Sequence, residues 1–153
     1  FYLKLYQGLK FFPTGKTGFV DVRDVVSIMV KLMHSEVKNE RFIVSSHNLS
    51  YQSLFEKMAK SMGTSPPTIK AKKWMAEIIW RLAWIKSIFS PQNAVITKQS
   101  AHNAMNSFTY NNSKLLSILQ HEFIPIDNTI DETAKQFLES QQQSKKIAIL
   151  PEY

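Results

Sequence analysis

Two groups of residues in this sequence have the types and the spacing to do chemistry, and a third group has only the types. Tyr110 and Lys114 are four residues apart, so on one helix they share a face, where a lysine can assist proton transfer from a phenol. Asp21 and Asp24 flank Arg23, an arrangement that can serve as an acid–base cluster. The four histidines lie far apart, without the spacing of metal ligands, so we expect no zinc site.

The tyrosine–lysine pair lacks the surroundings that catalysis would need. Tyr110 precedes the predicted helix, which begins at Asn112 or Ser113, instead of lying within it. The four glycines of the chain are too few and too scattered for a dinucleotide-binding loop, and none follows a strand in the required pattern. We therefore interpret Tyr110 as a packed tyrosine and Lys114 as a surface lysine. No catalytic residue is assigned to this chain.

The aspartates around Arg23 are better explained by the start of a helix. A short strand over Gly18 to Val20 leads into a helix that begins around Asp21. Asp21 can cap that helix, and Asp24 three residues later completes a pair resembling a capping box. Both carboxylates would lie at the positive end of the helix dipole. Behind the cap, the helical spacing of apolar residues predicts one buried face, made of Val22, Val25, Val26, Met29, Val30 and Met33.

The other elements needed to position these residues are short strands and helices. Strands are expected at Phe11–Phe12, Arg41–Ser45 and Thr68–Ala71, and helices at 50–62, 72–89, 97–104, 113–119 and from about 129. Ser50 is expected to cap the first of these helices, and Gly63 to end it. The fold class is therefore mixed α/β, helix-rich with a few short strands. Residues 1–140 form one domain, and residues 141–153 are expected to be a fraying tail.

Composition excludes several function classes. The chain of 153 residues is 44% hydrophobic, enough for one domain with a core, and it has no cysteine, which fits a cytoplasmic protein. The net charge is +7, but the lysines are spread out and form no basic stripe interleaved with aromatic residues, so no nucleic-acid partner is expected. The helix at 72–89 carries Trp74, Trp80 and Trp84. Its broad apolar coverage favours a core or subunit contact over membrane binding, and its charges and length argue against a bilayer span, so no membrane partner is expected.

Four segments resemble, in the same order, the C-terminal part of extended short-chain dehydrogenases, the NAD(P)-dependent epimerases, dehydratases and reductases. The first segment is Phe19-Val20-Asp21-Val22-Arg23-Asp24-Val25, and the second is Glu40-Arg41-Phe42-Ile43-Val44. The third is Asn48 to Phe55, and the fourth is Tyr110 to Leu116 followed by Phe123 to Ile126. The resemblance spans roughly Phe11 to Ser140 and is nearest to the dihydroflavonol-reductase-like group.

This resemblance implies a division of labour within a longer protein. In such oxidoreductases and epimerases an N-terminal Rossmann part holds NAD or NADP and the catalytic residues. This chain lacks that part, so it is expected to be a C-terminal substrate-binding fragment that binds no cofactor and has no turnover alone. The small-molecule substrate would face Phe11, Phe12 and Lys16. These two phenylalanines can equally be core residues beside a solvent-exposed turn.

Two further expectations concern partners. Apolar surface left exposed on such a fragment would favour a homodimer. The alternative to the enzyme fragment is a stand-alone basic α/β binding module for an anionic ligand or a protein partner. A third possibility, a peripheral membrane protein, is supported by the tryptophan helix alone.

Overall fold

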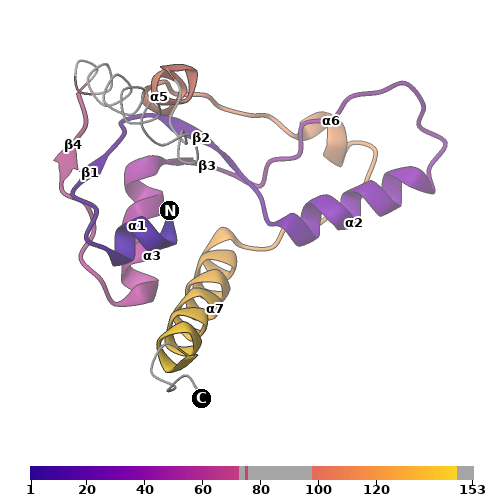
Figure 1. Ribbon diagram of the computed structural model, residues 1–153. Coiled ribbons are helices and arrows are strands. Elements are labelled where there is room, and N and C mark those ends of the chain that lie inside the picture. Colours follow the sequence, from indigo (N-terminus) through magenta and orange to yellow (C-terminus); the bar gives the residue numbers. More distant parts are fainter. Residues whose placement is uncertain (73–74, 76–97, 148–153) are drawn as a thin grey trace.

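The computed structural model describes residues 1–72, 75 and 98–147, which form a mixed arrangement of helices and short strands (Figure 1). The helices are α1 (Tyr2–Tyr6), α2 (Val22–Met33), α3 (Tyr51–Met62), α5 (Lys98–Met105), α6 (Ser113–Leu116) and α7 (Ile126–Ile147). The strands are β1 (Phe11–Phe12), β2 (Lys16–Phe19), β3 (His47–Ser50) and β4 (Ile69–Lys70). The expected α/β class is thereby confirmed at the level of mixed helix and sheet. The expected helix carrying Trp74, Trp80 and Trp84 falls almost entirely outside the described residues.

The strands of the described part form two small sheets. β1 pairs with β4 in parallel, with Phe11 opposite Ile69. β2 pairs with β3 in antiparallel register, from Lys16 opposite Ser50 to Phe19 opposite His47. Residues 106–108 run along the other side of β2, because the Lys16 amide donates to the Asn106 carbonyl at 3.2 Å and the Phe108 amide donates to the Lys16 carbonyl at 2.8 Å. Lys16 is therefore paired on both edges.

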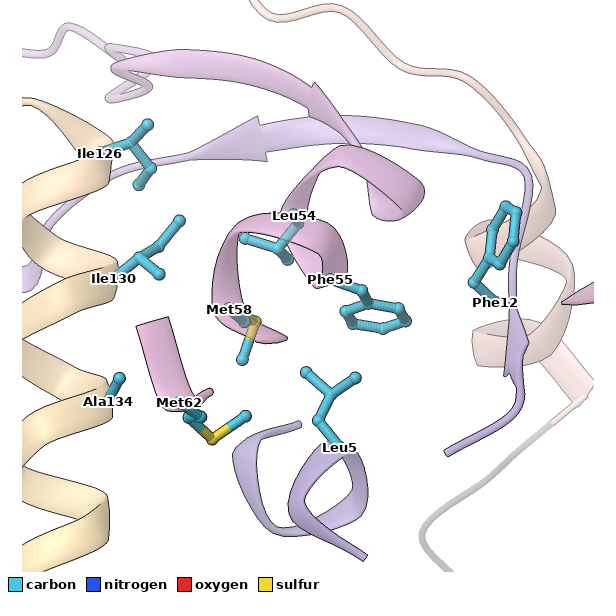
Figure 2. Packing of buried hydrophobic residues seen from close by; sticks show 9 residues of the cluster. All are labelled: Leu5, Phe12, Leu54, Phe55, Met58, Met62, Ile126, Ile130 and Ala134. Carbon is cyan, nitrogen blue, oxygen red and sulfur yellow. The ribbon is translucent and has the colours of Figure 1, made fainter. Parts of the chain in front are cut away.

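The core is built around α3, whose limits follow the sequence closely. The Ser50 hydroxyl accepts a hydrogen bond from the Ser53 amide at 3.1 Å, and Gly63 ends the helix in the left-handed conformation, with φ of 67°. The predicted inward face is confirmed, since Leu54, Phe55, Met58, Ala59 and Met62 are all buried. Figure 2 shows Leu54, Phe55, Met58 and Met62 beside α1 and α7. They belong to a buried cluster that comprises Leu5, Phe12, Leu54, Phe55, Met58, Met62, Ile126, Ile130 and Ala134.

The first and last helices of the described chain both pack on α3 and contact each other. Ile130 and Ala134 are buried on α7, as the sequence predicts, and the Tyr2 hydroxyl donates to the Ile130 carbonyl at 3.0 Å. Phe137 packs on Tyr2, with ring centroids 6.0 Å apart. The expectation of a tail from residue 141 is wrong up to Ile147, because α7 continues that far. Glutamine, lysine and glutamate are good helix formers, so the helix extends past its packed portion.

The predicted buried face of α2 is wrong. Val22, Val26, Met29, Val30 and Met33 are between 48% and 80% exposed. The opposite side of the helix faces inward instead, with Asp24 and Ile28 buried. In Figure 1, α2 lies next to α6 and away from α1 and α3, and only its first residues approach the start of α7.

The strand expected at Arg41–Ser45 does not form a ladder. The strand begins instead at His47, where β2 supplies a partner. Residues 41–45 are in none of the described strands, and Ser46 is the residue at which pairing starts, its amide donating to the Phe19 carbonyl at 2.9 Å. A segment with strand-forming residues becomes a strand only where a neighbouring strand is present.

Candidate functional site

Asp21 joins the start of α2 to the start of α7. Its carboxylate accepts hydrogen bonds from the Arg23 amide at 2.8 Å and from the Arg23 guanidinium at 2.7 and 3.0 Å. The Thr129 hydroxyl donates to the same carboxylate at 2.8 Å, and Arg23 also pairs with Glu132 at 2.8 Å. The predicted cap is therefore confirmed, and it serves as a connection between two helices as well. The hydrogen bonds from the Arg23 side chain hold the pKa of Asp21 well below its usual range, against the opposing effect of burial.

The stability that Asp21 provides should depend on pH. We expect Asp21→Asn to lower the free energy of unfolding by about 2 kcal/mol at pH 7, since it weakens the cap and the charge-assisted hydrogen bonds. The folded-state pKa is below the unfolded value of about 3.9, so this contribution is complete above that pH and is lost as the pH falls further. The difference between wild type and variant should therefore shrink at pH 3. Urea unfolding followed by circular dichroism at both pH values measures it, and an unchanged difference at pH 3 contradicts the assignment.

Asp24 does not complete the predicted capping box. Its buried carboxylate accepts instead from His121 Nε2 at 2.9 Å and from the Ile124 amide at 3.0 Å. The other ring nitrogen of His121 lies 3.3 Å from Lys31 Nζ, which also donates to the Gln120 carbonyl at 3.1 Å. Asp24 therefore fixes α2 to the segment before α7. No local pattern indicates His121 as its partner, because the two residues are 97 positions apart in the chain.

A second cluster of polar groups surrounds β2 and β3. The side-chain amide of Asn48 pairs with both backbone groups of Tyr110: Nδ2 donates to the carbonyl and Oδ1 accepts from the amide, each at 2.8 Å. The Asn112 side chain donates to the Ser45 carbonyl at 2.7 Å. Gly18 makes this approach possible, because a Cβ there would lie 2.8 Å from the Tyr110 ring and 2.5 Å from Ser45 Oγ. These contacts hold residues 110–112 against the sheet.

The structure does not bring Tyr110 and Lys114 together as a catalytic pair. Lys114 Nζ forms an ion pair with Glu40 at 2.5 Å and lies over the Phe42 ring, 5.3 Å from its centroid. The Tyr110 backbone is bound to Asn48, and Tyr110 precedes α6 instead of lying within it. This geometry supports the interpretation of Lys114 as a surface lysine, because the contacts of its side chain are a carboxylate and an aromatic ring.

The three residues expected near the substrate have different surroundings. Phe12 is buried in the core around α3 (Figure 2), which matches the core alternative for this residue. Phe11 is 40% exposed on β1. Lys16 is half-buried on β2, with its backbone bonded to residues 106–108. Phe11 and Lys16 keep side-chain surface free for a ligand in the chain as described, whereas Phe12 does not.

The described residues do not fit the pyrophosphate of a dinucleotide. Such a group binds to free amides at a helix N-terminus that follows a strand. Two described helices directly follow a strand in this way, α2 after β2 and α3 after β3. The N-terminus of α2 holds the carboxylate of Asp21 and that of α3 is capped by Ser50, so the first would repel phosphate and neither has a glycine-rich turn.

The described part of the chain has neither a cluster of metal-binding side chains nor a membrane-spanning helix. Across residues 1–72, 75 and 98–147, no three acidic, histidine or cysteine side chains come close enough together to hold a metal ion. No helix among these residues combines the length and the apolar character that crossing a membrane requires.

Comparison with known proteins gives a fold and no family. No protein-family model and no curated protein matches the sequence. Among solved structures, the chain is similar to the crystal structure of gox2253, with a TM-score of 0.68 and 15% sequence identity. The match covers 91% of this chain and 42% of that chain, so this chain spans less than half the length of the structure it matches. At this identity, the likeness establishes the fold alone.

Proposed function

We propose that this chain is the substrate-binding C-terminal part of an NAD(P)-dependent epimerase, dehydratase or reductase of the extended short-chain dehydrogenase kind. The proposal combines the four motif segments with the way in which they contact one another. It places the cofactor and the catalytic residues on another part of the same polypeptide. The fold match to part of a longer chain is consistent with this division.

The observation that carries the proposal is the convergence of the motif segments. Asp24 of the first segment binds the backbone of the fourth at Ile124. Asn48 of the third segment binds the backbone of the fourth at Tyr110. The carbonyl of Phe19, in the first segment, accepts from Ser46, just after the second. The four segments follow one another in the same order as in this family, and hydrogen bonds connect them in the structure. A shared architecture would produce such contacts.

The chain would contribute binding and orientation of the substrate, not proton or hydride transfer. Phe11 offers an exposed aromatic ring and Lys16 a cationic side chain, about five residues apart at the beginning of the two sheets. The rigid support behind Lys16 comes from strand pairing on both edges of β2. A polar substrate with an anionic or carbonyl group suits this pair of side chains. When bound elsewhere in the polypeptide, the nicotinamide would supply the hydride chemistry.

A fluorescence titration tests the proposal. NADPH and NADH are titrated with this chain and with the longer product that its gene encodes, and cofactor fluorescence is followed. We expect saturable binding by the longer product only, because the described helix N-termini do not accept a pyrophosphate. Bovine serum albumin at equal concentration controls for non-specific enhancement. Binding by neither protein contradicts the proposal and favours the basic binding module.

A further inference from the structure

One side of α2 is an apolar stripe with no partner among the described residues. Val22, Val26, Met29 and Met33 are separated by four, three and four positions, so they lie on one side of the helix, and Val30 widens the stripe. All five are at least 48% exposed. The other side of α2 is held by Asp21 and Asp24 through hydrogen bonds. A helix anchored by its polar residues and exposing its apolar ones is built to be covered by something else.

Residues 41–44 have no strand partner among the described segments of the same region. Phe42, Ile43 and Val44 form a continuous apolar run, which is typical of strands covered on both faces. Ile43 is 49% exposed, and within the described part of the chain no backbone hydrogen bond joins residues 41–44 to another segment. An unpaired run of strand-forming residues is a template for pairing with a strand.

The order of the two features along the chain indicates what covers them. A helix, a short connection and an extended segment make up the second half of a crossover unit. In such a unit the helix packs its apolar face on the sheet that the extended segment joins. Here the helix is α2 and the extended segment is residues 41–45. Neither of the two described sheets includes that segment. A third sheet is therefore missing from this arrangement.

We propose that the apolar stripe of α2 and residues 41–45 together form a docking surface for a β-sheet. Residues 41–45 would add a strand to that sheet, and α2 would cover one of its faces. The sheet would come from a part of the same polypeptide outside residues 1–153. This choice of source rests on the proposed function, in which a cofactor-binding part of the same polypeptide contains a sheet.

A second copy of this chain fits the surface less well. Among the described elements, a second copy offers either its own segment 41–44 or one of two sheets that have two short strands each. Pairing with either would give a sheet of only two or three short strands, which is too narrow to cover the apolar side of a helix of 12 residues. The matched crystal structure also shows this fold within a chain more than twice as long, since the match covers 42% of it.

Hydrogen exchange followed by mass spectrometry tests the surface. The amides of residues 41–45 are compared between this chain and the longer product of its gene. We expect exchange to be slower in the longer product by about 100-fold or more, because strand pairing protects amides that are free here. Exchange in α3 should differ far less, since that helix is already packed. Equal exchange at 41–45 in the two proteins overturns the proposal, and so does a gene that encodes no further sheet-forming sequence.

Two variants make the test specific to the stripe. Met29→Asp should lower the melting temperature of the longer product by about 5 °C or more and leave that of residues 1–153 nearly unchanged. Gln142→Asp places the same charge on an exposed position of α7, outside the stripe, and should change neither protein. Protection at 41–45 that appears in this chain alone and rises with its concentration would identify a second copy as the occupant and overturn the proposal.

The two proposals can fail separately. Protection of residues 41–45 without any binding of NADPH or NADH leaves the docking surface in place and overturns the proposed function. Cofactor binding by the longer product without protection of residues 41–45 supports the proposed function and overturns the docking surface.

Discussion

Asp24→Ala is expected to lower the free energy of unfolding by about 3–5 kcal/mol. The Asp24 carboxylate is buried and accepts hydrogen bonds from the His121 ring and from the Ile124 amide, at 2.9 and 3.0 Å. The His121 side chain is itself only 6% exposed, so removal of the carboxylate leaves the buried His121 ring and the part-buried Ile124 amide without this acceptor. The attachment of α2 to the segment before α7 would be lost with it.

Urea unfolding at pH 7 measures this effect. Glu122→Ala is the matched control, because Glu122 is an exposed carboxylate on the same segment, and its removal should change stability by no more than about 0.5 kcal/mol. Asp24→Asn should lie between wild type and Asp24→Ala, since its single side-chain oxygen can still accept one of the two hydrogen bonds. A loss below about 1 kcal/mol for Asp24→Ala would show that the carboxylate does not hold α2 in place.

Gly15→Ala is expected to cost about 3 kcal/mol, or to prevent folding altogether. A Cβ at this position would overlap the backbone carbonyl oxygens of Ala104 and Asn106. The Gly15 amide also donates to the Ala104 carbonyl at 3.1 Å, so the two segments cannot separate without breaking the pairing along β2. Because the overlapping atoms are backbone, no side-chain rotation relieves the contact.

Gly8→Ala separates the effect of space from that of backbone conformation. Gly8 has φ of 82°, and a Cβ there would meet nothing within 4 Å. Its substitution should therefore cost only the strain of a left-handed residue, about 1 kcal/mol. Thermal unfolding followed by circular dichroism at 222 nm compares the two variants. Equal losses for Gly8→Ala and Gly15→Ala would mean that the close approach of residues 104–106 does not constrain Gly15.

Local sequence signals predicted α3 well, because all of them agree. Ser50 caps the helix, Gly63 ends it, and the apolar residues between them face a core that the described chain itself supplies. The same reasoning failed for α2. Periodicity identifies which side of a helix is apolar, but not whether a partner covers that side. Here the buried side is set by Asp24 and Ile28, and the apolar stripe is left exposed.

The candidate site shows the same division between local and distant information. The role of Asp21 as a cap depends on residues next to it and could be predicted. Its bond to Thr129 and the bond of Asp24 to His121 depend on chain segments about one hundred positions away, for which the sequence contains no spacing rule. Asn48 was part of a motif, yet its pairing with Tyr110 emerged only from the fold.

The way in which α1 and α7 enclose α3 has a consequence for how the chain is made. The Tyr2 hydroxyl reaches the Ile130 carbonyl across 128 positions, and Leu5, Phe55 and Ile130 belong to one core. A ribosome must therefore synthesise the chain past residue 130 before that core can close. Until then the part of the α3 face that meets α7 stays uncovered, and closing so long a loop is entropically costly. The nascent chain is thus expected to expose apolar surface, and to need protection from aggregation, between the synthesis of α3 and that of α7.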